Sequence, residues 1–230
     1  MAPRDFRTRL ARRAGKAGLF VPDDLAERLG AYIDLLSRWN RKMNLTALDD
    51  PDEAIDRLLL EPLAAARHLS IVSGRFMDVG SGGGSPAIPL KLAVPGLAVT
   101  MVEAKARKSA FLREAVRTLE ISDAIVETAR HEELLARPEL HESFDVVTMR
   151  AVRVEAKTLN TLQAFLAPGG EMLLFRGPAG PSEPAVVVPP LQWRATHPLV
   201  ESLQSRVTIL GKRSVGMFHV KHRAMDAPTG

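Results

Sequence analysis

A glycine-rich turn between an apolar stretch and a helix-forming stretch restricts the fold of this chain more than any other feature. The segment Asp78–Pro86 reads DVGSGGGSP and continues the short apolar run Phe76–Val79. Glycine permits tight turns and lets a ligand approach the backbone closely. A glycine turn that follows a strand and opens a helix is the setting in which parallel α/β folds bind nucleotide-like ligands, at the carboxyl ends of their strands.

The spacing of the glycines separates two classes of ligand. A dinucleotide fingerprint, Gly-x-Gly-x-x-Gly, begun at Gly80 would require a glycine where Ser85 stands. The observed order is acid-x-Gly-x-Gly-x-Gly, and S-adenosylmethionine, which lacks a pyrophosphate but carries an ammonium group, gives the acid Asp78 a use. We therefore expect S-adenosylmethionine as the cofactor. The expected contacts in the turn are Asp78, Gly80, Ser81, Gly82, Gly84 and Ser85.

Polar residues follow three further expected strands. Glu103 stands 21 residues after Gly82, where a carboxylate can accept hydrogen bonds from both ribose hydroxyls. His131 and Glu132 follow the third strand and can contact the adenine ring. Arg150 follows the fourth strand, at the mouth where cofactor and substrate meet, and is the candidate for positioning the substrate. The alternatives are a surface acid at Glu103, a loop residue at His131 and a structural ion-pair partner at Arg150.

Strand and helix patterns alternate after Arg75, which predicts a mostly parallel sheet of seven strands with helices on both faces. Before it, apolar spacing predicts helices over Asp23–Trp39 and from an N-cap at Asp50 towards Leu69, with Pro62 able to split the second one. The last two strands are expected near Leu191–Thr196 and Ser214–Val220. We divide the chain into a flexible basic tail (1–20), a helical extension (21–72), a Rossmann-like domain (73–223) and a loose C-terminal tail (224–230).

Charge and composition limit the possible partners. The net charge is +4, the sequence pI is about 9.7 and there is no cysteine, which excludes disulfides and a cysteine nucleophile. No apolar run is long enough for a membrane span and no secretory signal is recognised, so we expect a cytoplasmic protein. Basic residues that could bind phosphates or simply be solvated gather near the two ends: Arg4, Arg7, Arg9, Arg12, Arg13 and Lys16, then Arg206, Lys212, Arg213, Lys221 and Arg223.

Several short motifs together resemble one family. Trp39-Asn40 and Asn44-Leu45-Thr46 form a WNxxxNLT segment, and the glycine turn ends in PAIPL over residues 86–90. Lys108 with Phe111-Leu112, the Arg150-Ala151 pair and Arg176-Gly177 fit the same pattern. Over roughly residues 30 to 220 the chain is similar to the RsmG family, also called GidB. The resemblance implies a class I S-adenosylmethionine-dependent methyltransferase that modifies N7 of a guanine in bacterial 16S ribosomal RNA.

The resemblance also implies roles for particular residues. Gly80, Ser85, His131, Glu132 and Arg150 match positions that hold the cofactor or line its pocket in the family. The remaining substrate candidates are Asn40, Asn44, Arg176 and Arg213. The chain departs from the family pattern at Leu58, Glu61, Pro62, Ala87, Met149 and Arg176, in and around the expected substrate pocket.

Alternative functions remain open at this level. The chain could methylate another RNA, a protein or a small molecule, bind RNA on a degenerate methyltransferase fold, or act as a nicotinamide-dependent oxidoreductase. The expected partner is 16S rRNA or the small ribosomal subunit, and the expected state is a monomer. His219 and His222 lack a nearby carboxylate or thiolate, so no metal site is expected.

Overall fold

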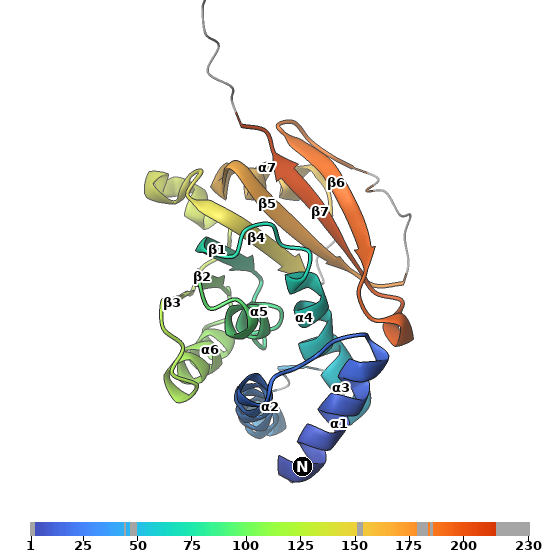
Figure 1. Ribbon diagram of the computed structural model, residues 1–230. Coiled ribbons are helices and arrows are strands. Elements are labelled where there is room, and N and C mark those ends of the chain that lie inside the picture. The colour runs from blue at the N-terminus through green and yellow to red at the C-terminus, as the bar shows by residue number, and fades with distance from the viewer. Residues whose placement is uncertain are drawn as a thin grey trace, which may run out of the picture.

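The computed structural model describes residues 3–43, 45–46, 50–150, 154–178, 184 and 186–214, which centre on one seven-stranded sheet (Figure 1). The strand order is β3-β2-β1-β4-β5-β7-β6. Strands β1 to β5 are mutually parallel, whereas β7 pairs antiparallel to β5 and β6. The strands are β1 (Gly74–Val79), β2 (Leu97–Val102), β3 (Ala124–Glu127), β4 (Phe144–Arg150), β5 (Leu166–Arg176), β6 (Leu191–Pro198) and β7 (Arg206–Lys212).

Helices cover both faces of the sheet, as the alternating sequence pattern predicted (Figure 1). Strand residues alternate between two buried clusters: Phe76 and Leu173 pack with the N-terminal helices, while Met77 and Leu174 pack with α7. The helices are α1 (Pro3–Lys16), α2 (Asp23–Met43), α3 (Pro51–Ile55), the π-helical turn η1 (Asp56–Leu60), α4 (Glu61–Ala66), α5 (Ala87–Ala93), α6 (Ala106–Thr118) and α7 (Ala156–Phe165), with short 3-10 turns η2 (Glu133–Ala136), η3 (Pro138–Leu140) and η4 (Glu201–Leu203).

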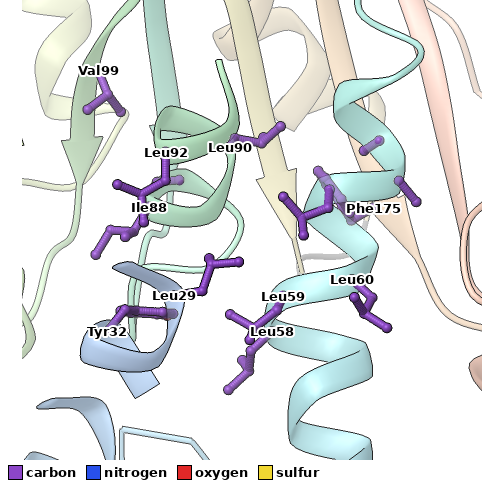
Figure 2. Close-up of a cluster of buried hydrophobic side chains, with 14 of the residues drawn as sticks. Leu29, Tyr32, Leu58, Leu59, Leu60, Ile88, Leu90, Leu92, Val99 and Phe175 are labelled. Carbon is purple, nitrogen blue, oxygen red and sulfur yellow. The ribbon is translucent and has the colours of Figure 1, made fainter. Parts of the chain in front are cut away.

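The N-terminal helices pack directly against the sheet and its helices and share one apolar core with them. Leu29 and Tyr32 of α2, Leu59 of η1 and Ile88 of α5 are at most 1% exposed and belong to one apolar cluster (Figure 2). Burying side chains of this size stabilises the fold by roughly 1.5–3 kcal/mol each. This packing fixes α2 and η1 against the segment that leaves β1, where the glycine turn lies.

Residues 1–20 differ from the flexible tail that was expected. Pro3–Lys16 form helix α1, because Phe6, Leu10 and Ala14 recur at four-residue steps and are buried, with exposed fractions of 5%, 1% and 2%. The many arginines between them gave the segment the composition of a solvated tail and concealed this apolar stripe.

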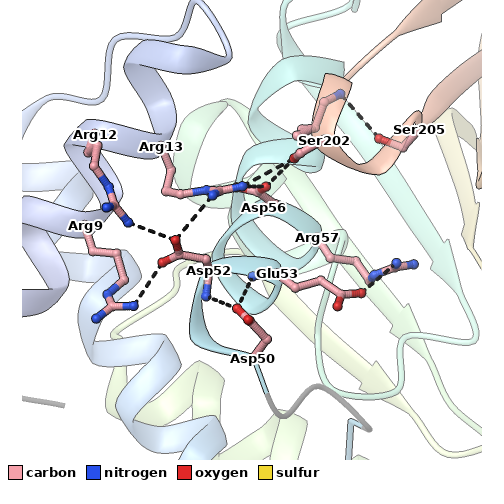
Figure 3. Close-up of polar contacts among 11 residues, drawn as sticks. Arg9, Arg12, Arg13, Asp50, Asp52, Glu53, Asp56, Arg57, Ser202 and Ser205 are labelled. Carbon is pink, nitrogen blue, oxygen red and sulfur yellow. Dashed lines mark hydrogen bonds and ion pairs between the residues drawn. The ribbon is translucent and has the colours of Figure 1, made fainter.

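The arginines of α1 are bound to acids (Figure 3). Arg9 and Arg12 contact the carboxylate of Asp52 at 3.0 and 2.8 Å, and Arg13 binds Asp56, which is 2% exposed. The Ser202 hydroxyl donates to the same Asp56 carboxylate at 2.6 Å. These contacts join α1 to α3, η1 and η4, so Arg9, Arg12 and Arg13 contribute to the fold through their ion pairs.

The helix that begins at Asp50 is interrupted as Pro62 suggested. The Asp50 side chain caps α3 by accepting from the backbone N–H groups of Asp52 and Glu53. Pro62 has no N–H to donate to the carbonyl of Leu58 four residues earlier, and that carbonyl instead accepts from the Ser85 hydroxyl at 2.9 Å. The π-helical turn just before the proline therefore presents carbonyl groups to the glycine turn.

The C-terminal strands differ from the prediction. The expected strand at Leu191–Thr196 is confirmed as β6, but the seventh strand is Arg206–Lys212. Of the predicted range Ser214–Val220 only Ser214 is described, and it lies outside any strand. Lys212 is not available to a polyanion either: its side chain is 4% exposed and donates to Glu142 and to two backbone carbonyls. No helix in the described ranges combines the length and apolarity needed to cross a bilayer.

Candidate functional site

The glycine turn connects β1 to α5 at the carboxyl edge of the parallel strands. Gly80, Gly82 and Gly84 have φ angles of 77°, 52° and 89°, the left-handed region that side chains rarely adopt. A Cβ at Gly84 would lie 2.5 Å from Ile88 Cδ1, so this position also requires glycine for space. The turn thus brings bare backbone to the strand edge, as the sequence predicted.

A pocket of about 260 Å³ lies beside this turn, where β1, β2 and β4 end and the chain leaves β3. Four of the predicted cofactor contacts line it together: Gly80, Glu103, His131 and Glu132. His131 is half-buried, and its Nδ1 lies 3.2 Å from the Glu132 carboxylate. The remaining wall was not foreseen and consists of Val79, Val102, Ala104, Ala129, Arg130 and Met149.

Asp78 is fully buried beneath the turn, and half of its carboxylate lacks a partner. Thr148 donates a hydrogen bond to Oδ1, whereas Oδ2 has no hydrogen-bond partner among the described residues. Burial raises the pKa of Asp78 to about 6, and the hydrogen bond from Thr148 opposes the shift. An unsatisfied buried carboxylate oxygen is costly unless a cation or donor reaches it. The ammonium group of S-adenosylmethionine, directly or through water, is a group of that kind.

Glu103 is 7% exposed and holds the pocket in shape. Its carboxylate accepts from the backbone N–H of Gly82 at 3.0 Å and from that of Lys105 at 2.8 Å. The same carboxylate lines the pocket, which is the position expected of a group that binds ribose hydroxyls. Glu103 therefore links the turn, the start of α6 and the cavity.

The two serines of the turn have structural partners. The Ser81 hydroxyl is 1% exposed and donates to the Asp78 carbonyl at 3.1 Å. The Ser85 hydroxyl donates to the Leu58 carbonyl and accepts from Arg150 at 3.1 Å. Neither serine lines the pocket, so their side chains support the turn, whatever contact their backbone makes.

Arg150 takes the structural role that was its alternative interpretation. Its guanidinium donates to the Arg57 carbonyl at 2.7 Å, to Ser85 and to the Glu61 carboxylate, with which it forms a buried ion pair. Desolvation lowers the pKa of Arg150, opposed by the charge of Glu61. Arg150 does not line the pocket. In the structure it joins the glycine turn to η1 and α4; a role in positioning the substrate stays a prediction.

The other substrate candidates do not converge on the pocket. The Asn40 side chain is occupied, because its amide donates to the Thr46 carbonyl at 3.0 Å and its oxygen accepts from the Thr46 N–H at 2.8 Å. Asn44 lies outside the described residues. Arg176 ends β5 at the carboxyl edge of the sheet. Arg213 follows antiparallel β7 and lies at the opposite edge, away from the turn.

Two residues that support the site were missed. The Tyr32 hydroxyl, on α2, donates to the Gly83 carbonyl at 2.6 Å, and burial raises the pKa of Tyr32. Thr148, on β4, lies opposite Asp78 in the parallel pairing of β1 and β4. A polar residue in an apolar strand was the available signal for Thr148. Tyr32 occupies an ordinary core position of its helix, so nothing in the sequence indicated that its hydroxyl would reach the glycine turn.

The described part of the chain contains no set of side chains that could bind a metal ion. No group of three or more histidine, aspartate or glutamate side chains there could hold an ion, and the sequence has no cysteine. His219 and His222 lie outside the described residues.

Sequence comparisons match the chain to rRNA methyltransferases. The sequence model of the GidB family, described as rRNA small subunit methyltransferase G, matches residues 25–188. Ribosomal RNA small subunit methyltransferase G of Xylella fastidiosa (strain 9a5c) is 40% identical over 177 residues, covering 74% of this chain and 77% of that protein. The protein of the same name from Xanthomonas campestris pv. campestris (strain B100) is 39% identical over 178 residues, covering 76% and 80%.

Comparisons with solved structures show the fold. A SAM dependent methyltransferase from Aquifex aeolicus aligns with a TM-score of 0.53 at 14% identity, covering 76% of this chain and 97% of that one. The methyltransferase yhhF from Escherichia coli aligns with a TM-score of 0.52 at 16% identity, covering 74% and 91%. The seven-stranded, mostly parallel sheet is therefore that of class I S-adenosylmethionine-dependent methyltransferases, as predicted.

Proposed function

Because the chain belongs to the GidB family, rRNA small subunit methyltransferase G, we propose that it transfers the methyl group of S-adenosylmethionine to N7 of a guanine in bacterial 16S rRNA. The observation that carries the proposal is the pocket beside the glycine turn, with the unsatisfied Asp78 carboxylate beneath it. The substrate would be 16S rRNA or the small ribosomal subunit, and the setting the cytoplasm. The monomeric state stays a prediction.

Residues of the pocket and of the turn would hold different parts of the cofactor. Asp78 would attract the positive amino acid end, Glu103 would accept from the ribose hydroxyls, and His131 with Glu132 would contact the adenine edge. The glycine backbone leaves room for the cofactor chain between these groups. Bound S-adenosylmethionine supplies a methyl group on a positive sulfur, which is electrophilic without further activation.

The chain contributes position rather than proton transfer. Guanine N7 carries an exposed lone pair, so no general base is required of the protein. Among the described residues, the acid–base pair that lines the pocket is His131 and Glu132. Holding two reactants in line can supply several kcal/mol of the barrier reduction. Met149 and Val102 provide apolar surface that excludes water near the reacting atoms.

Labelled methyl transfer tests the proposal. The full chain is incubated with labelled S-adenosylmethionine and with 16S rRNA or small subunits that lack the modification, and the product nucleoside is identified by mass. Labelled 7-methylguanosine is the expected product. Cofactor binding without transfer to rRNA would leave the fold and pocket in place and assign the chain to another RNA, a protein or a small molecule.

A further inference from the structure

A groove larger than the cofactor pocket runs between α2 and α6, which lie side by side on one face of the sheet (Figure 1). Its volume is about 790 Å³, and it shares no residue with the pocket. Arg38, Trp39 and Lys42 line it from α2, and Glu114, Arg117 and Glu120 from the side of α6. A surface cavity of this size is large enough to hold part of a ligand.

The α2 wall of the groove combines exposed cations with a fixed aromatic ring. Arg38 and Lys42 are exposed, stand four residues apart and form no ion pair with any described residue. The Trp39 ring between them is half-buried and meets the Phe111 ring at 5.7 Å and 65°. On the other wall Glu114 is paired with Arg117 at 2.7 Å, which reduces its repulsion of an anion. Cations that flank an aromatic ring are the arrangement by which proteins hold single-stranded RNA.

The two helices that form the groove also approach the cofactor turn, at residues outside the groove itself. The first turn of α6 carries exposed Arg107 and half-buried Lys108, and Lys108 Nζ would lie 3.8 Å from a Cβ on Gly82. On the other side, Leu36 of α2 lies 3.3 Å from the Cβ position of Gly83. Both α2 and α6 thus contribute one wall of the groove and one side chain close to the glycine turn.

The other basic cluster at this end of the molecule cannot take the same part. Arg9, Arg12 and Arg13 of α1 are held by Asp52 and Asp56 (Figure 3). The two carboxylates already offset much of their charge within the fold. On the groove side, Arg38 interacts electrostatically with Glu114, whereas Lys42 and Arg107 form no ion pair with any described residue, so these cations remain exposed to a phosphate.

We propose, on the basis of the proposed function, that the α2–α6 groove binds a single-stranded segment of the substrate rRNA next to the target guanine. Arg38, Lys42 and Arg107 bind its phosphates, and the Trp39 ring contacts a base. Phosphate contacts supply affinity and register, while the pocket selects the methylated atom.

Two triple variants of the full chain separate groove binding from general charge. The first carries R38A, K42A and R107A. The control carries K16A, K157A and R213A, which removes the same number of exposed cations from α1, α7 and the opposite edge of the sheet. We measure binding to 16S rRNA over a salt series, KM and kcat for methyl transfer, and the dissociation constant for S-adenosylmethionine.

The groove variant should bind rRNA at least about tenfold more weakly, and the slope of log affinity against log salt should fall by about two, since each phosphate contact contributes about 0.7 for single strands. KM for rRNA should rise, with kcat and cofactor affinity near those of the parent chain. The control should change the slope by less than one. A groove variant that matches the parent chain or the control overturns the proposal while the proposed function stands. Absence of methyl transfer to rRNA by the parent chain overturns both.

Tryptophan fluorescence gives a readout that a purely structural role would not move. The chain has two tryptophans, Trp39 and exposed Trp193 on β6, so W193F leaves Trp39 as the only one. Quenching of Trp39 by an rRNA fragment, and loss of that quenching in the R38A/K42A/R107A background, is the expected result. Unchanged emission while the fragment is bound would contradict base contact at Trp39.

Discussion

The buried carboxylate of Asp78 makes a quantitative prediction about stability. Its pKa is raised from 3.8 to about 6, so the folded state holds this proton more tightly than the unfolded state does. The free energy of unfolding should therefore fall as pH rises through the window from 3.8 to about 6, and stay lowered above it. A shift of about two units corresponds to about 3 kcal/mol at pH 8, an upper value.

The substitution Asp78→Asn removes the titration while keeping an oxygen that accepts from Thr148. Between pH 5 and pH 8, linkage with these two pKa values changes the contribution of Asp78 by about 1 kcal/mol. The difference in free energy of unfolding between D78N and the parent chain should therefore shift by about that amount in favour of D78N at pH 8. Urea denaturation without cofactor at both pH values measures it, because the other titrating groups cancel in the difference.

The same substitution should weaken S-adenosylmethionine binding, since the amide no longer attracts an ammonium group. Stability and affinity thus move in opposite directions at pH 8, as expected where a site is strained for function. A stability difference that does not vary with pH would refute the reasoning about burial. Unchanged cofactor affinity would refute the role of the unsatisfied oxygen.

Other contacts of the site give further expectations. Glu61→Gln should cost about 3 kcal/mol of unfolding free energy by leaving buried Arg150 without its counter-charge, whereas E61D should retain most of it; equal urea midpoints for both would contradict this. Tyr32→Phe should weaken cofactor binding several-fold in calorimetry without changing rRNA affinity, because the glycine turn loses a hydrogen bond. Desolvation, and then the charge of His197, whose ring stacks on that of His68, lower the pKa of His68 from 6.5. The unfolded state therefore takes up the proton first, and stability should fall below about pH 6.5; a H68N variant with the same fall would exclude this pair as its source.

The order of strands and helices could be predicted because each carries its own periodicity. The run Phe76–Val79, the apolar face of α6 and the cap at Asp50 are local signals, and all appear in the structure. Helix α1 was missed because its arginines outweighed three apolar residues. Strand β7 was misplaced because its apolar run carried no turn signal that distinguished it from the segment that follows.

The same distinction between local signals and tertiary packing applies to the candidate site. Gly80, Glu103, His131 and Glu132 could be placed together because position after a strand fixes them at one edge of the sheet. The partners of Arg150 and Asn40 could not be predicted, because the local pattern does not reveal which groups their hydrogen bonds reach. For Arg150 those partners are Glu61 and the Arg57 carbonyl, more than eighty residues away. Which partner a polar side chain satisfies is decided by tertiary packing.

The ties between α1, η1 and η4 bear on the order in which the chain can assemble as it leaves the ribosome. The Arg13 guanidinium lies 3.3 Å from the Ser202 hydroxyl across 189 residues of sequence, and Ser202 also donates to Asp56. Strand β7 follows Ser202 and inserts between β5 and β6. The first helix can therefore dock early on η1, but its anchorage closes only after the segment around residue 202 has been synthesised. The sheet is therefore completed, and helix α1 fully anchored, at the same late stage of synthesis.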